Sequence, residues 1–444
     1  MPPVQQAGFP HWEAEFDENG AAVDAAAIDV LVDEASAKVT DLFVFSHGWN
    51  NDHATARDLC LRFFTQMQTV LTSRPPATAK IGTVGILWPS IRWADETPPG
   101  RAGGAASLAA AAPAAPSDQQ LALNLKSVFT KPEQQAAIDA MAGLLRDRPR
   151  DEQQLRHFQE LIGQLTGTPA PGAPPGAGVP AAVEDNGEAA GLLGQDAIDV
   201  FKRFASLAPQ HHAGGAVGLG DVFSGLWNGA KEALRVASYW EMKKRAGKIG
   251  QGGLGPILDR LQAKSAVLKV HLIGHSFGAR LVSFALAGVK ADPPRVIESV
   301  VLLQGAFSHF AFAPKLPQDP NRGGALAGMN ARVDGPLCVT FSAKDLAVGT
   351  AYPLASIAAR DDSAALSDLL FRWGGMGHDG AQAVGAAIAP LGPVGVKYSF
   401  GVGSFLNLDG NNVITQGGPP AGAHSDIVHP EIAWAVLAAA RVVS

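Results

Sequence analysis

The chain is organised around residues 267–282, VLKVHLIGHSFGARLV. The stretch begins as an apolar, β-branched run of strand length, breaks at Gly274-His275-Ser276-Phe277-Gly278, and resumes with apolar residues at helical spacing. A buried strand, a Gly-x-Ser-x-Gly turn and a helix, in that order, predict a nucleophile elbow that exposes the Ser276 hydroxyl at the end of the strand. Gly274 and Gly278 leave the room that so tight a turn requires. The alternative is a glycine-rich strand-to-helix turn that carries a serine by chance.

The segments around this stretch predict a parallel α/β fold. Before it, a strand at 41–45, a helix from about residue 54 and a strand at 81–87 follow one another. After it come predicted strands at 297–303 and 336–341, a further strand or hairpin at 398–406 and a terminal helix that Pro430 opens. Near the N-terminus, Asn19-Gly20 predicts the turn of an antiparallel edge hairpin.

A long segment without a predicted core strand separates the early strands from the elbow. Residues 97–116 and 167–190 are rich in Pro, Gly and Ala and read as flexible connections. Helical patterns lie between and after them, from residue 131, at 151–165, from 195 and at 221–245. We therefore expect core segments at 1–98 and 249–444 and a helical cap inserted at 99–248. The alternative is that the insertion is partly disordered, only packs against the core and has no role at the site. Long insertions in compact domains are, however, often functional.

Composition narrows the class of protein. The chain has 444 residues, 47% hydrophobic and 17% charged, with a net charge of -6. No basic stripe stands out, which disfavours a nucleic-acid partner. No uninterrupted apolar run reaches the length of a membrane span, and the N-terminus shows no secretory signal. Cys60 and Cys338 lie in apolar segments and read as buried thiols, so a cytoplasmic location is expected.

The chain resembles the α/β-hydrolase superfamily. The resemblance rests on His47-Gly48-Trp49, the elbow at 274–278, Asp345 and His424, which appear in the family's order at predicted strand ends. It covers about residues 38–98 and 255–440, and the insertion has no counterpart. It implies an α/β-hydrolase fold with a mostly parallel sheet, and a serine hydrolase that cleaves carboxylic esters of small-molecule or lipid-like kind. A lipase with an interfacially opened cap and a non-catalytic binding or scaffold protein are the alternatives.

The resemblance also implies roles for single residues. Ser276 needs a base, and the family's histidine precedes the terminal helix, as His424 does; His378 and His429 are alternatives. Asp345, at the end of the second strand after the elbow, is expected to orient that histidine. Other acidic residues of this region read as solvated or loop-ordering charges: Asp334, Asp361, Asp362, Asp379 and Asp426.

The tetrahedral intermediate needs backbone N–H donors. The amide of Phe277 is expected to supply one, and the loop of Gly48 and Trp49 the other. The alternative for this loop is a His-Gly turn in which Trp49 only packs. Near the same rim, the residues expected to contact substrate are His47, His275, Trp88 and Gln304. Trp88 could instead fill the core. No zinc-type spacing or phosphate-binding glycine motif occurs, so neither a metal nor a cofactor is implied.

Overall fold

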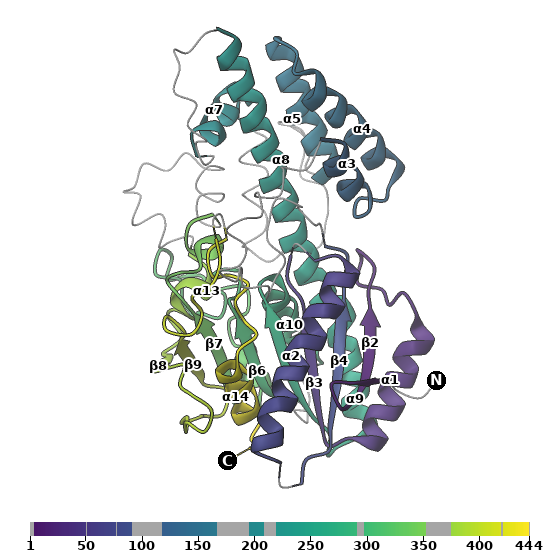
Figure 1. Ribbon diagram of the computed structural model, residues 1–444, viewed down its shortest axis with the longest axis vertical. Coiled ribbons are helices and arrows are strands. Elements are labelled where there is room, and N and C mark those ends of the chain that lie inside the picture. Colours follow the sequence, from purple (N-terminus) through teal and green to yellow (C-terminus); the bar gives the residue numbers. More distant parts are fainter. Residues whose placement is uncertain are drawn as a thin grey trace, which may run out of the picture.

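The computed structural model shows an α/β protein built on one mostly parallel sheet (Figure 1). It describes residues 4–49, 51–76, 78–90, 118–166, 195–207, 219–290, 297–351, 374–418 and 421–443. Within these ranges nine strands form the sheet, in the order β1-β2-β4-β3-β5-β6-β7-β9-β8. The strands are β1 (Val4–Gln6), β2 (Phe9–Glu15), β3 (Asp41–Ser46), β4 (Ile81–Leu87), β5 (Lys269–His275), β6 (Ile297–Leu303), β7 (Leu337–Phe341), β8 (Ala387–Pro390) and β9 (Phe405–Asp409).

Helices cover both faces of the sheet, which explains why its central strands are buried along almost their whole length and are mostly apolar. Side chains of one strand alternate between the faces: Leu42 and Val44 join one core cluster, and Phe43 and Phe45 the other. The first cluster lies under α1 (Ala25–Lys38), α9 (Gly255–Lys264) and α10 (Phe277–Gly288), and the second under α2 (His53–Ser73) and α14 (Pro430–Ala439).

The single antiparallel pair among the described strands of this sheet is β1 with β2, which form a hairpin at one edge. Its turn is Ala7-Gly8, where both residues have positive φ (52° and 82°). The edge hairpin predicted at Asn19-Gly20 is therefore wrong in position. That turn closes only an isolated bridge between Phe16 and Ala22, and β2 pairs with β4 in parallel instead.

The opposite edge also differs from the sequence-based prediction. The sequence of residues 381–396 is apolar but contains Pro390, Pro393 and several glycines, which predicts a loop or broken helix. The segment instead contains β8, an exposed strand paired in parallel with β9. An edge strand has one neighbour and little buried surface, so its sequence carries little of the usual strand pattern. The strand expected at 398–406 starts only at Phe405, as β9.

A helical bundle stands above the end of the sheet where the parallel strands finish (Figure 1). All four predicted helical patterns of the insertion form helices, and α3 is an additional one. Aromatic side chains fill the bundle, with Phe158 in edge contact with both Phe201 and Trp227. The helices are α3 (Asp118–Lys126), α4 (Pro132–Asp147), α5 (Glu152–Thr166), α7 (Ala197–Leu207) and α8 (Leu219–Ile249). The connections at 97–116 and 167–190 lie outside the described residues.

Helix α8 joins this bundle to the body of the protein as one continuous element of 31 residues. At the bundle end, a Cβ on Gly229 would lie 2.0 Å from the Phe201 carbonyl oxygen. Beyond α8 the chain continues as the π-helical turn η2 (Gly250–Leu254), and a Cβ on Gly250 would lie 2.1 Å from the Leu281 carbonyl oxygen. Glycines thus let α8 and η2 pack directly on the backbones of α7 and α10.

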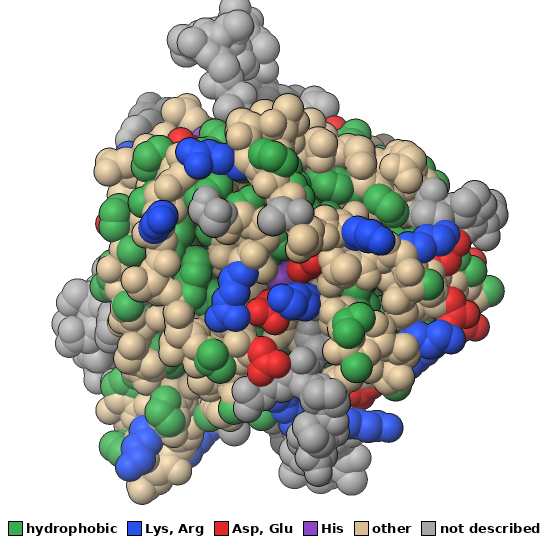
Figure 2. All heavy atoms as spheres, turned by 90° about the horizontal axis from the view of Figure 1, so that it is seen from below, with side chains coloured by type: hydrophobic (Ala, Val, Ile, Leu, Met, Phe, Trp, Pro, Cys, Tyr) green, Lys and Arg blue, Asp and Glu red, His purple; other side chains and the backbone are tan. Residues whose placement is uncertain are grey.

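The surface agrees with the mixed charge of the sequence. The end of the molecule away from the bundle carries Lys, Arg, Asp and Glu side chains interspersed with apolar ones, without a continuous basic patch (Figure 2). Within the described ranges, no helix is long and apolar enough to cross a membrane. Cys60 and Cys338 are both free and buried, as predicted.

Candidate active site

Ser276 sits at the junction of β5 and α10 in a backbone conformation that L-residues rarely adopt, with φ 58° and ψ -121°. Such strain persists only where surrounding contacts enforce it. Here the turn is held by hydrogen bonds from Ser276 N–H to the Leu303 carbonyl and from Ala306 N–H to the Ser276 carbonyl. The strand, turn and helix predicted from the sequence are all present.

The two glycines of the motif are required by close backbone approach. A Cβ on Gly274 would lie 2.3 Å from the Gly278 carbonyl oxygen, and one on Gly278 would lie 2.1 Å from the Ser46 carbonyl oxygen. A third glycine belongs to the facing loop: a Cβ on Gly48 would lie 2.4 Å from the Ser276 Cβ. The loop that follows β3 therefore passes directly over the serine.

His424 and Asp345 meet Ser276 across the ends of three strands. His424 Nε2 lies 2.8 Å from Ser276 Oγ, and His424 Nδ1 lies 2.8 Å from Asp345 Oδ2. Because the carboxylate only accepts, Nδ1–H donates to it and Nε2 is left to accept the serine proton. The loops of the acid and the histidine also pair directly, through an isolated bridge between Asp345 and Gly422. The three side chains form one continuous hydrogen-bonded chain.

The two alternative histidines are engaged elsewhere. His429 stands at the start of α14, where its Nε2 lies 2.7 Å from Asp426 Oδ1, and this bond raises its pKa. His378 belongs to the short helix α13 (Met376–Asp379), and its ring packs against Gly349. Neither reaches Ser276 Oγ in a hydrogen bond. Asp426 orders the loop before α14 by accepting N–H bonds from Thr415 and Gln416.

The Asp345 carboxylate is fully buried, and both of its oxygens accept hydrogen bonds besides the one from His424. Gln304 Nε2 donates to Oδ2 at 3.0 Å, and the Val348 amide donates to Oδ1 at 3.0 Å. Gln304 was expected to contact substrate. It is instead fully buried at the end of β6, where it braces the acid.

The two backbone amides predicted to bind an oxyanion belong to Phe277 and Trp49. Phe277 occupies the first position of α10, where an amide has no carbonyl partner within its own helix. The Gly48 carbonyl accepts hydrogen bonds from His47 Nδ1 (2.9 Å) and Asn51 Nδ2 (3.1 Å). Since a trans peptide sends its N–H opposite to its C=O, the Trp49 amide points away from these donors. Asn51 is held in turn by Ser90, whose hydroxyl donates to the Asn51 carbonyl at 2.6 Å.

His47 and Trp88 support this loop from behind. Both are buried; their rings stack at 5.3 Å, and the Trp88 indole N–H donates to the His47 carbonyl. His47 Nε2 accepts the Trp88 backbone N–H at 3.3 Å. Because His47 Nδ1–H donates to the Gly48 carbonyl, each ring nitrogen of His47 has a hydrogen-bond partner inside the protein. The prediction that these two side chains contact substrate is therefore not supported, and Trp88 fills the core.

His275 braces the loop that carries His424 rather than facing outward. Its Nε2–H donates to the His424 carbonyl at 3.0 Å, and the two rings lie 5.1 Å apart. Burial, together with the neighbouring His424, lowers the pKa of His275 to about 3. Burial likewise lowers the pKa of His47 to about 4. Both imidazoles are thus neutral near neutral pH, and the fold depends on their neutral forms.

This dependence predicts a loss of stability in mild acid. The pKa of each imidazole is lower in the native state than its ordinary value of 6.5, so the unfolded chain binds the extra proton first. The contribution is fully present above pH 6.5 and is lost as the pH falls toward about 4 for His47 and about 3 for His275. At pH 5 we expect about 2 kcal/mol less stability for each of His47 and His275. Urea unfolding at pH 7 and pH 5 measures this loss of stability, and His275→Gln should remove the part of the difference that His275 contributes.

The raised pKa of His429 changes the stability in the opposite direction over this pH range. Equal stability at the two pH values would contradict the assignment.

Sequence reasoning missed an aromatic contact from the insertion. Tyr239 of α8 packs against Phe277 at 4.7 Å and against Trp49 at 5.6 Å between ring centroids. Helix α8 therefore touches both segments that carry the candidate oxyanion amides. Tyr239 has the same helical spacing as other buried positions of α8, so only the three-dimensional contact distinguishes it.

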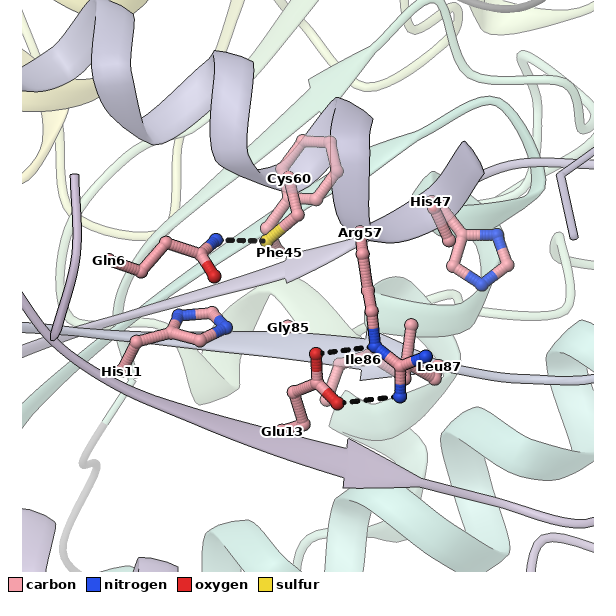
Figure 3. Close-up of a pocket in the computed structure, with 11 residues that line it drawn as sticks. Gln6, His11, Glu13, Phe45, His47, Arg57, Cys60, Gly85, Ile86 and Leu87 are labelled. Atoms are coloured by element: carbon pink, nitrogen blue, oxygen red, sulfur yellow. Dashed lines mark hydrogen bonds and ion pairs between the residues drawn. The ribbon is translucent and has the colours of Figure 1, made fainter. Parts of the chain in front are cut away.

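A small pocket lies between the hairpin edge of the sheet and α2, and His47 is one of its lining residues (Figure 3). Arg57 and Glu13 close it with two hydrogen bonds of 2.8 Å each. Inside it, burial raises the pKa of the Cys60 thiol and lowers that of His11 to about 4, so both are uncharged. None of Ser276, His424 and Asp345 lines it. In the described part of the chain, no cluster of three or more His, Cys, Asp or Glu side chains could hold a metal ion.

Comparison with protein-family models, curated proteins and solved structures found no match, so the site is interpreted from its own geometry.

Proposed function

We propose that this chain is a serine hydrolase of the α/β-hydrolase fold that cleaves carboxylic esters through an acyl-enzyme. The observation that carries the proposal is the hydrogen-bonded chain Ser276–His424–Asp345, with 2.8 Å at each link and the serine on a strained elbow. Support for the fold comes from the parallel sheet, the strand–elbow–helix unit and the order of serine, acid and histidine along the chain.

The geometry suits acyl transfer in two half-reactions. Ser276 Oγ attacks the ester carbonyl carbon while His424 Nε2 takes its proton, and Asp345 stabilises the imidazolium that forms. The carbonyl oxygen becomes an oxyanion, which the amides of Phe277 and Trp49 would stabilise. His424 then gives the proton to the leaving alcohol as the C–O bond breaks. In the second half, water attacks the acyl-enzyme with the same histidine as base, and Ser276 is released with a carboxylic acid.

The insertion contributes to positioning more than to an acyl pocket. The aromatic residues of the insertion, Phe201, Phe204, Trp227 and Trp240, suggest an apolar acyl pocket from the sequence, but all four side chains are buried. The Trp227 indole N–H is also used internally, donating to the Pro149 carbonyl at 3.1 Å. Arg245, buried on α8, donates to the carbonyls of Pro89 in the body and Val128 in the bundle. These contacts and the continuity of α8 favour a fixed cap over one that opens at a lipid surface.

Hydrolysis of 4-nitrophenyl esters of graded acyl length tests the proposal. We expect saturable hydrolysis of esters below their solubility limit, because a fixed cap needs no interface to open. Activity that rises sharply only when substrate exceeds its solubility would favour the lipase alternative. Absence of hydrolysis across the series, together with no reaction with a serine-directed probe, would favour a non-catalytic binding or scaffold protein.

A further inference from the structure

Gln304 is the second residue near the site that holds a strained backbone, with φ 47° at the end of β6. Its side chain is fully buried. A non-glycine residue is kept in this region only where its surroundings fix it, and such residues cluster at functional sites. The hydrogen bonds of the Gln304 side chain explain why this backbone conformation is kept.

Every polar atom of the Gln304 side chain is engaged. Nε2 donates both to Asp345 Oδ2 at 3.0 Å and to the Gly377 carbonyl at 2.8 Å. Oε1 accepts from the Thr340 hydroxyl at 3.0 Å, and the same hydroxyl accepts the Gln304 backbone N–H at 3.2 Å. Thr340 on β7 therefore fixes which end of the amide faces the acid. The result is an ordered chain from Thr340 through Gln304 to Asp345.

We propose that Gln304 is a positioning residue for the acid: its amide holds Asp345 Oδ2 toward His424 and shares that oxygen's negative charge. The inference rests on the proposed function for its catalytic consequence. Oδ2 accepts from both Gln304 and His424, whereas Oδ1 is held by the Val348 amide. Gln304 thus competes with His424 for the same oxygen and sets how strongly the carboxylate attracts the imidazolium.

The direction of the effect follows from this competition. A carboxylate that loses a donor carries more charge on the remaining acceptor site, so it favours protonated His424 and raises the pKa of that imidazole. Few other charges face this pair among the described residues. Apart from Asp345, His275 lies beside His424 with ring centroids 5.1 Å apart, the His378 ring packs against Gly349, and Lys344 directs its ammonium to the Asn411 carbonyl.

The test is Gln304→Met, which keeps the length of the side chain and removes its donor. In the full-length protein labelled with nitrogen-15 histidine, NMR titration of His424 should show an acid dissociation constant roughly three- to tenfold smaller than in the wild type. The acid limb of kcat/KM should move to higher pH by the same amount, with kcat about tenfold lower because the acid is less well held.

Thr340→Val gives a second variant that leaves Gln304 in place but frees its amide, and Thr340→Ser is its matched control with the hydroxyl kept. We expect Thr340→Val to shift the His424 titration in the same direction as Gln304→Met but by a smaller amount, and Thr340→Ser to behave as wild type. An unchanged His424 titration in folded Gln304→Met or Thr340→Val protein would overturn the inference. The titration is independent of turnover, so a shift in a protein that hydrolyses no ester would refute the proposed function alone.

Discussion

Replacing Ser276 with alanine is expected to lower kcat for ester hydrolysis by about 10⁵- to 10⁶-fold, the loss typical of removing the nucleophile of a working triad. The physical reason is the absence of another nucleophile at this point: His424 Nε2 accepts from Ser276 Oγ, and the elbow at 274–278 presents no other side-chain oxygen. Substrate binding should change little, because the alanine removes only one oxygen atom.

Ser283, in helix α10 that follows Ser276, offers a matched control. Its hydroxyl is buried and has no hydrogen-bond partner among the described residues, so Ser283→Ala should retain wild-type kcat. Steady-state kinetics with the best ester of the graded series measures both variants. More than about one per cent of wild-type kcat in Ser276→Ala would show that the nucleophile is a different group, since residual catalysis by the remaining site is far smaller.

The second large effect is expected at His424. Without its imidazole the serine has no base, and His424→Ala should lower kcat by about 10⁵-fold. Asp345→Asn should lower it by about 10⁴-fold, because the amide favours the wrong imidazole tautomer. His378→Ala and His429→Ala are the controls, and both should stay within a few-fold of wild type since neither bonds Ser276. If one of these controls lost activity while His424→Ala retained it, the assignment of the base would be wrong.

The elbow was predictable because everything that defines it is local. A buried strand, two glycines around a serine and a helical stripe lie within one continuous stretch, and the structure has each of them. Asp345 and His424 were predicted from the resemblance to the α/β-hydrolase superfamily. The parallel sheet explains why they meet, since the carboxyl ends of parallel strands lie at one edge of a sheet. The core strands were predictable because each is a short, continuous apolar run in the sequence, which is also a local signal.

The residues that support the site could not be read from the sequence. Gln304 follows β6 just as a pocket residue would, and nothing in its neighbours reveals a positive φ or a bond to Asp345. His47 and Trp88 occupy strand ends like contact residues, yet both are engaged in hydrogen bonds within the loop. Such assignments depend on partners that are about forty residues away in the chain.

The N-terminal edge of the sheet also could not be predicted, because it depends on contacts between segments that are distant in the sequence. The Asn19-Gly20 turn has the sequence of a hairpin, but β2 lies in parallel beside β4, so the turn leads into α1 instead. Turn chemistry is local, whereas strand pairing is decided by long-range burial. Tyr239 adds a case from the insertion, because only the packing of α8 on α10 brings it to Phe277 and Trp49.

The most direct test of the central claim is the reaction of the native protein with a fluorophosphonate, followed by mass spectrometry of its peptides. A serine activated by His424 should form one covalent adduct, located on Ser276, and Ser276→Ala should form none. Acid should slow the reaction, since a protonated His424 cannot take the serine proton. No adduct under conditions where a known serine esterase reacts fully, or an adduct on another residue, would contradict the account.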